Sequence, residues 1–373
     1  MRGAAGALWM IMQATILTDG NQAARGLAAK DRCKSERKDQ RLRTMNGRLR
    51  TSIVLCTYNG IAHLEEQLGS LLSQTRPPDE VVIGDDGSTD GTWSMLLDFA
   101  RACGSRGISI RLKQQPRNLG FVANFSDMLR QATGDLLFLC DQDDVWRADK
   151  LATMVPRFVK EPKLALLASD ARLVDADGRC MGATVFQAIG VTVTEIRSIH
   201  AASSFDVLLR RSMMVGATTA FRRELLPSVL PVAPGWIHDE WLGIVLSAIG
   251  RVDVVEDTLI DYRQHARNQV GMRVRKASDW WRDMVAGRAT ELAAELARVD
   301  VLQAVLASLG AAVPTRCIGA LEDKRAYLEA RISLGRVNRA ARARHVWRQW
   351  RCGVYHRFGT GVRTALRDML RYD

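Results

Sequence analysis

The stretch Ser52–Gly60 reads SIVLCTYNG, a short apolar run that ends in a Tyr-Asn-Gly turn. Leu64, Leu68 and Leu71 follow at helical spacing, so this segment predicts a strand, a loop and a helix in that order. The same unit recurs three times. The further strands are expected at 80–84, 108–112 and 135–140, and the further helices at 93–100, 121–132 and 150–159. Such alternation predicts a parallel sheet with helices on both faces.

The second half of the chain predicts a more mixed set of elements. Strand-like or extended runs are expected at 164–169, 213–220, 252–255 and 259–262, and helices at 205–211 and 240–249. From about residue 277 the chain is rich in Ala, Leu and Arg, and it predicts helices that break near 310–314. We therefore divide the chain into a basic extension (1–50), an α/β domain (51–271) and a basic helical region (272–373).

Composition and charge restrict the class of protein. The chain of 373 residues is 47% apolar and 25% charged, which excludes wholesale disorder and a polytopic membrane protein. The net charge of +12 belongs to the two ends of the chain, since residues 331–373 alone contain 11 Arg and two Asp. Basic ends beside a mildly acidic middle fit a membrane surface or disordered arms better than a nucleic-acid-binding fold.

The cysteines and the N-terminus favour a cytoplasmic protein. The seven cysteines are widely spaced without a CxxC pair, which is typical of reduced thiols. The apolar run 4–17 is shorter than the roughly 20 residues of a membrane-spanning helix. A signal peptide is the alternative for this run, but we expect an unstructured extension, with Met45 as a candidate for the true start.

Polar, acid-rich loops follow three of the predicted strands, at the edge where ligands bind in parallel sheets. They are 57–60, 85–90 and 141–144, and the last of them reads DQDD. Turn and helix-capping chemistry explains Asp, Asn, Gly and Ser in the first two loops without any function. Three carboxylates in four residues instead favour a hard divalent cation with a bridging phosphate. Neither GxGxxG after the first strand nor GxxxxGK[ST] occurs, which argues against a Rossmann cofactor and a P-loop.

At these residues the chain resembles the family 2 glycosyltransferases of the GT-A fold, and within them the rhamnosyltransferase-like branch. The resemblance covers about residues 52–271. Its carriers are TYNG at 57–60, DDGSTDGT at 85–92, Asn118-Leu119-Gly120 with Asn124-Phe125, FLCDQDDVW at 138–146, HDEW at 238–241 and DYRQH at 261–265. The resemblance implies a Rossmann-like mixed sheet flanked by helices, with a helical C-terminal extension. It also implies transfer of a sugar from a nucleotide diphosphate donor to an acceptor hydroxyl, with inversion.

The resemblance also implies roles for individual residues at the donor site. Thr57, Tyr58 and Asn59 would line the nucleoside pocket, and Asp85 or Asp86 would hydrogen-bond the base. Asp141 and Asp143 would form the DxD motif, with Asp143 on Mg²⁺ or Mn²⁺ and Asp141 on the ribose or a metal-bound water. Asp144 is the alternative ligand. His265 would be a further metal ligand or a structural hydrogen bonder, and Arg263 would contact the diphosphate. Asn118 and Asn124 would support the donor sugar.

By the same resemblance Asp239 is the base that takes the acceptor proton, and Glu240 is the substitute candidate. The alternative for Asp239 is an acid in the first turn of a helix, stabilised by the helix dipole. Trp146 and Trp241 could stack on a sugar ring at the donor or acceptor site, although core packing is the stronger alternative for both.

A helical stripe is expected near the C-terminus. Ala343, Trp347, Trp350, Val354 and Phe358 recur at spacings of three and four, with arginines largely off the stripe. Such a helix could lie in an anionic membrane interface, or it could pack its stripe on the catalytic domain.

The best interpretation is a transferase of rhamnose from dTDP-rhamnose to a glycan or lipid-linked glycan, in O-antigen-like polysaccharide synthesis at the inner face of the membrane. A UDP-galactose or UDP-glucose transferase is the first alternative. A nucleotidyltransferase is weaker because it needs a Gly-rich, basic loop after the first strand, and a non-catalytic membrane binder would leave the acidic loops unexplained. No nucleic-acid partner is expected.

Overall fold

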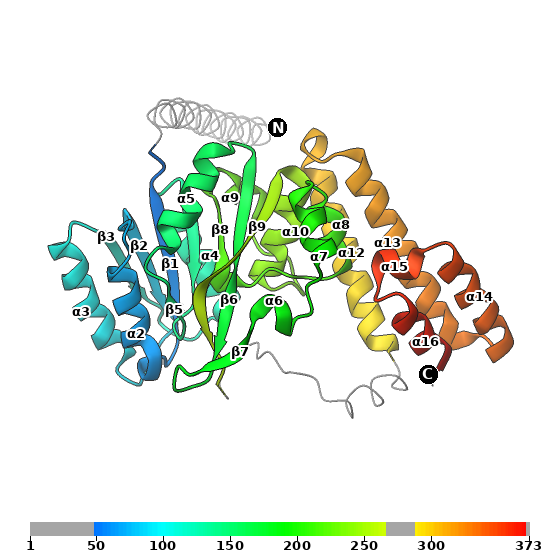
Figure 1. The fold of residues 1–373 in the computed structure, drawn as a ribbon, viewed down its shortest axis with the longest axis horizontal. Coiled ribbons are helices and arrows are strands. Elements are labelled where there is room, and N and C mark those ends of the chain that lie inside the picture. The colour runs from blue at the N-terminus through cyan, green and yellow to red at the C-terminus, as the bar shows by residue number, and fades with distance from the viewer. Residues whose placement is uncertain (1–47, 266–287, 371–373) are drawn as a thin grey trace, which may run out of the picture. The chain divides into compact units, whose positions relative to one another are not determined.

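A mixed sheet of nine strands runs through the described residues, 48–265 and 288–370, of the computed structural model (Figure 1). The strand order is β3-β2-β1-β4-β8-β6-β9-β5, and β7 pairs with β6. The strands are β1 (Thr51–Thr57), β2 (Glu80–Asp85), β3 (Ser109–Gln114), β4 (Leu136–Cys140), β5 (Val145–Trp146), β6 (Leu164–Val174), β7 (Cys180–Thr184), β8 (Thr219–Arg222) and β9 (Arg251–Arg263). The described residues from Arg50 onward fall in one compact unit, which contains every strand of this sheet.

The first half of the sheet is parallel, as the sequence predicts. β1 pairs in parallel with β2 and β4, and β2 pairs in parallel with β3. β1 and β4 are buried along their whole length, because helices cover both faces of a parallel sheet. These helices are α2 (Ile61–Leu72), α3 (Thr92–Ser105), α4 (Phe121–Gln131) and α5 (Lys150–Lys160). Right-handed crossovers place α2 and α3 on one face, and α4, which returns the chain from β3 to β4, on the other (Figure 1).

The second half of the sheet is mixed, and here one expected strand is displaced. β8 is antiparallel to both β4 and β6, whereas β9 is parallel to β6 and antiparallel to the two-residue β5. Residues Gly216–Thr218 form a 3-10 turn, so the strand expected at 213–220 begins only at Thr219. The pairing of β5 with the end of β9 brings Asp143 and Asp144 beside Arg263.

Helices complete the unit. Those that accompany the second half of the sheet are α6 (Val185–Ala188), α7 (Val193–His200), α8 (Ser204–Arg210), α9 (Leu226–Val229) and α10 (His238–Ile249). The C-terminal helices are α12 (Ala289–Ser308), α13 (Thr315–Ser333), α14 (Arg339–Arg351), α15 (Val354–Phe358) and α16 (Val362–Leu370). The predicted break lies between α12 and α13, where Gly310–Ala312 forms a 3-10 turn. None of the described helices combines the length and the hydropathy needed to cross a bilayer.

The expected single stripe from Ala343 to Phe358 is wrong. Helix α14 ends at Arg351, and Gly353 adopts a positive φ of 75° before α15 begins. Phe358 is buried against Tyr327 of α13, while Trp347 is 58% exposed. The aromatic residues of the stripe therefore face different surroundings.

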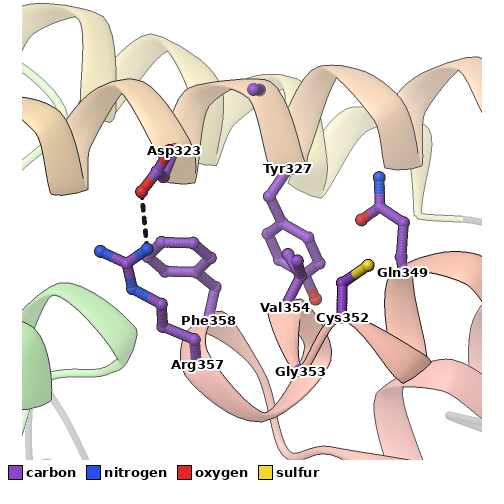
Figure 2. Close-up of a pocket in the computed structure, with 9 residues that line it drawn as sticks. Asp323, Tyr327, Gln349, Cys352, Gly353, Val354, Arg357 and Phe358 are labelled. Carbon is purple, nitrogen blue, oxygen red and sulfur yellow. Dashed lines mark hydrogen bonds and ion pairs between the residues drawn. The ribbon is translucent and has the colours of Figure 1, made fainter.

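A cavity of about 300 Å³ lies where α13 meets the end of α14 and α15 (Figure 2). Tyr327 and Phe358 supply aromatic rings to its wall, and Asp323 pairs with Arg357 at 2.6 Å. A second cavity of about 140 Å³ lies among α8, α10, α12 and α13. Neither cavity includes the acidic loops at the ends of β2 and β4.

Candidate active site

The polar loops after β1, β2 and β4 converge at one edge of the sheet. The backbone N–H of Tyr58 donates to Gln142 Oε1 at 2.8 Å, and Gln142 Nε2 donates back to the Tyr58 carbonyl at 3.1 Å. The N–H of Thr89 donates to Asn59 Oδ1 at 2.8 Å. The first loop is therefore joined to the other two, as the sequence predicts.

Two of the carboxylates expected at the nucleoside pocket are engaged within the protein. Asp85 is fully buried and accepts a hydrogen bond from Thr57 Oγ1 at 2.9 Å. Asp86 is also buried, and it accepts hydrogen bonds from the N–H groups of Leu119 and Gly120 at 2.7 and 2.9 Å. These bonds hold the nucleoside loops in shape, and they connect Asp86 to the loop that begins at Asn118.

The loop Asp141–Asp144 concentrates negative charge. Loss of hydration, followed by the charges of Asp143 and Asp239, raises the pKa of Asp141 to about 7. Burial and the two neighbouring carboxylates raise the pKa of Asp144 well above its usual range. The Oδ1 atom of Asp144 accepts from the Arg263 N–H at 3.1 Å, while its buried Oδ2 has no partner among the described residues.

A buried lysine faces this loop, and sequence reasoning missed it. The Nζ atom of Lys150 donates to the Ala217 carbonyl at 2.7 Å and lies 3.5 Å from the centre of the Trp146 ring. Burial lowers the pKa of Lys150 to about 7, and the charges of Asp144 and Asp141 oppose that shift. Lys150 begins a helix in the sequence, and nothing in its local pattern predicts that it turns toward the carboxylates.

The oxygen atoms at this edge fit a hard divalent cation. His265 Nε2 lies 2.8 Å from Asp143 Oδ2, and the ring of His63 stacks on His265 at 5.0 Å between centroids. Within residues 48–265 and 288–370 no three His, Cys, Asp or Glu side chains are placed to hold an ion alone. A cation here would therefore need phosphate and water oxygens as well. The unpartnered Oδ2 of Asp144 and the raised pKa of Asp141 fit carboxylates whose charge a cation would neutralise.

Asp239 lies in the first turn of α10, close to the loop Asp141–Asp144. Its charge contributes to the raised pKa of Asp141. Its Oδ2 accepts from the Gly216 N–H at 2.9 Å and its Oδ1 from the Glu240 N–H at 2.7 Å. A Cβ atom at Gly216 would lie 3.0 Å from His238 Nε2, so glycine permits the close approach of this loop to α10. The structure thus places Asp239 near enough to the loop Asp141–Asp144 for its charge to act on Asp141.

Several other candidates have structural contacts instead. Arg263 is 2% exposed, and its guanidinium bonds the Asp143 and Ala176 carbonyls and Glu66. Asn124 is buried and donates to the Gly84 carbonyl at 2.7 Å. These contacts support the acidic loop and β2 respectively, and they engage the side chains that were expected to contact the diphosphate and to support the donor sugar.

The two tryptophans favour the core-packing alternative. Trp146 and Trp241 are 2% and 1% exposed, so neither presents a face on which a sugar could stack. Trp241 Nε1 donates to the Val229 carbonyl at 2.9 Å. Glu240 forms an ion pair with Arg298 of α12, while Asn118 remains exposed and accepts from the Gly120 N–H at 3.0 Å.

His63 and His238 are further polar residues at the site that sequence reasoning did not select. His238 stacks on Phe125 at 4.4 Å, and neither ring nitrogen has a partner among the described residues. Burial lowers the pKa of His238. The place of His238 in the HDEW motif could have pointed to it as a site residue. No motif in the sequence points to His63.

Comparison with known proteins agrees with this geometry. Residues 52–229 match the family described as Glycosyl transferase family 2. An uncharacterized protein of Mycobacterium tuberculosis (strain ATCC 25618 / H37Rv) is 29% identical over 248 residues, which cover 66% of this chain and 67% of that protein. An uncharacterized glycosyltransferase of Nostoc sp. (strain PCC 7120 / SAG 25.82 / UTEX 2576) is 26% identical over 227 residues, covering 59% and 66%.

Two further proteins are similar to this chain over a shorter segment or at lower sequence identity. The poly-beta-1,6-N-acetyl-D-glucosamine synthase of Staphylococcus epidermidis (strain ATCC 35984 / DSM 28319 / BCRC 17069 / CCUG 31568 / BM 3577 / RP62A) is 27% identical over 122 residues, covering 33% of this chain and 28% of that one. The crystal structure of S. aureus TarS 1–349 shares 16% identity and a TM-score of 0.49, over 85% of this chain and 90% of that one.

The sheet with its flanking helices is the GT-A fold, and residues 52–229 match the family 2 glycosyltransferase model. The protein is a glycosyltransferase.

Proposed function

We propose that the protein is an inverting, metal-dependent transferase that moves a sugar from a nucleotide diphosphate donor to a hydroxyl group of a glycan or lipid-linked glycan. The observation that carries this proposal is the proximity of Asp239 to Asp141, whose pKa its charge helps to raise. An inverting transferase needs a base and a diphosphate site close to each other, and Asp239 and the loop Asp141–Asp144 are our candidates for the two.

In this proposal each residue has a distinct part. Asp239 accepts the proton of the acceptor hydroxyl, because its backbone bonds with Gly216 and Glu240 fix the carboxylate while leaving further lone pairs available. Asp143 with His265 is the cation-binding group, and Asp141 and Asp144 are the further oxygen ligands. A divalent cation bound there would neutralise the charge that the leaving diphosphate gains. Tyr58 and Asn59 face the nucleoside on the loop that Gln142 and Ser88 brace.

For the donor we propose dTDP-rhamnose, which the motifs at 138–146 and 262–265 support, and UDP-galactose or UDP-glucose is the alternative. For the pathway we propose cell-surface polysaccharide synthesis. The name of the Staphylococcus epidermidis relative, a synthase of a polysaccharide, supports this setting. The enzyme would act at the cytoplasmic side of the membrane, where a lipid-linked acceptor is presented.

The test is donor hydrolysis and transfer with dTDP and UDP sugars, with and without Mn²⁺ or Mg²⁺, on the wild type and on Asp239→Asn. We expect metal-dependent turnover of one donor and a loss of about 10² to 10⁴ in rate in the variant. Asp206→Asn is the matched control, because Asp206 is also an acid in the first turn of a helix, but an exposed one. Equal losses in both variants, or turnover that is indifferent to metal, would contradict the proposal.

A further inference from the structure

Helix α16 is turned with its polar side inward. Asp368 is fully buried, and its carboxylate accepts hydrogen bonds from Arg331 Nε at 2.7 Å, from Arg331 Nη2 at 2.9 Å and from Tyr355 Oη at 2.9 Å. Thr364 and Ala365 are buried beside it. These contacts fix the rotation of the helix on α13 and α15.

The outer side of the same helix is apolar. Its residues are Val362, Leu366, Met369 and Leu370, which are 49%, 43%, 44% and 48% exposed. They recur at spacings of three and four, so they form one continuous face, here called the α16 face. A surface helix ordinarily buries its apolar side and exposes its polar side. This inverted arrangement indicates that the α16 face has an apolar partner.

Basic residues border the α16 face. Arg363 and Arg367 lie along its edge on the same helix. The neighbouring helix α14, which packs on α16, exposes Trp347 together with Arg344, Arg348 and Arg351 on one side. Residues 331–373 contain 11 Arg and two Asp, and one of these two, Asp368, is the buried partner of Arg331. The C-terminal region that contains the α16 face is therefore strongly positive.

Charge selects among the possible partners. A second copy of the chain would place one arginine-rich region against another. The segments 1–47 and 266–287, which lie outside the described residues, also contain more Lys and Arg than Asp and Glu. An anionic bilayer complements both properties, because acyl chains receive the apolar residues while lipid headgroups lie near the arginines and the exposed tryptophan.

We propose that the α16 face and the exposed side of α14 form the docking surface for an anionic membrane. This inference deepens the proposed function. The docking surface itself does not depend on that function, but its purpose does, since docking would bring the enzyme to a lipid-linked acceptor. The contact is peripheral, with the helix lying in the plane of the headgroups.

The experiment is flotation of the full chain with vesicles of phosphatidylcholine alone or mixed with phosphatidylglycerol. We expect binding to the anionic vesicles and weaker binding as salt is raised. Leu366→Glu should reduce the partition coefficient about tenfold or more, and Arg363→Gln about fivefold. Leu97→Glu is the matched control, because Leu97 is 40% exposed on α3 and outside this surface, and it should bind as the wild type does.

Three outcomes would overturn the proposal: the wild type does not bind anionic vesicles, Leu366→Glu binds as well as Leu97→Glu does, or the wild type forms a dimer that Leu366→Glu dissolves. Circular dichroism and thermal unfolding identify a variant that merely fails to fold, and Met369→Glu then serves as the second variant. Donor hydrolysis with a soluble acceptor is measured in parallel. Loss of docking leaves that activity unchanged, whereas failure of the proposed transferase function leaves vesicle binding unchanged.

Discussion

Asp141 is a single carboxylate whose burial costs the folded protein stability. Its environment raises its pKa to about 7, so the folded chain binds a proton there that the unfolded chain, with an ordinary Asp pKa near 4, has already released. Between these two values the stability of the metal-free protein falls as pH rises, because the unfolded state binds fewer protons. Above about pH 7 the charge is present in both states and the destabilisation is complete.

We therefore predict that Asp141→Asn makes the metal-free protein more stable while it abolishes turnover. The gain should be clear at pH 8, smaller at pH 5.5, and absent near pH 4, where the carboxyl is protonated in both states. Thermal unfolding with a chelator present measures it. Asp149→Asn is the control, since Asp149 pairs with Arg147 at the surface and its pKa is lowered. A loss of stability at pH 8 in Asp141→Asn would contradict the electrostatic account.

At this scale the sequence predicts which residues gather at the site but not what each of them contacts. The motifs predict that Asp141 and Asp143 lie at the edge where the loops after β1, β2 and β4 meet, and the structure places them there. The burial of Arg263 could not be predicted, since it depends on the pairing of β5 with β9, a contact between residues more than a hundred positions apart. The burial of Trp241 could not be predicted from its local sequence either, because its indole bonds the Val229 carbonyl only in the folded chain.

At the scale of elements, the buried ion pair between α13 and α16 is the main polar connection to the last helix. We predict that Asp368→Asn destabilises the protein by about 3 kcal/mol, because Arg331 would remain buried without its full counter-charge. Urea unfolding measures the loss.

The control for this prediction is Asp323→Asn, which removes the exposed partner of Arg357 (Figure 2). Exposed pairs contribute about 1 kcal/mol or less. Equal effects of the two substitutions would show that the Arg331 pair is not held in a buried network with Asp368 and Tyr355.

The helices and strands differ in how well local sequence predicts them. The strand and helix units from β1 to α5 follow their predicted ranges closely, because apolar periodicity and turn residues agree there. The prediction of one helix from Ala343 to Phe358 is wrong at Gly353. Its positive φ interrupts the helix, although the apolar spacing continues beyond it. The inward polar side of α16 could not be predicted either, since Asp368 finds its partner 37 residues earlier in the chain.

At the scale of the whole molecule, we predict from the crowded carboxylates that a nucleotide and a metal ion stabilise the fold more when both are present than either does alone. A nucleoside diphosphate brings further negative charge to this edge, so alone it should bind weakly. With Mn²⁺ present, ligand at about a hundred times its dissociation constant should raise the free energy of unfolding by about 2.7 kcal/mol. Thermal unfolding with nucleotide alone, metal alone and both together tests this, and an equal shift with nucleotide alone would contradict it.

The ion pair between Glu240 and Arg298 connects the helix that carries Asp239 to the C-terminal helices. Arg298 also lies 4.0 Å from the centre of the Trp236 ring, which precedes the same helix. We predict that Arg298→Met lowers the turnover number more than it raises the KM for donor, because the donor loops are untouched while α10 loses its restraint. Steady-state kinetics measures both parameters, and a change confined to the KM for donor would contradict the prediction.

The match to the family model ends at residue 229, nine positions before α10 begins at His238. The loops proposed for the donor therefore lie inside the matched segment, and Asp239 lies beyond it. A chimera that kept only the matched segment and took the remainder from a relative would retain the loops proposed for the donor, yet it would exchange Asp239, its neighbour Glu240 and the helix that holds them. Such a chimera would have to rebuild the hydrogen bond from the Gly216 N–H to Asp239, because the two residues would then come from different parents.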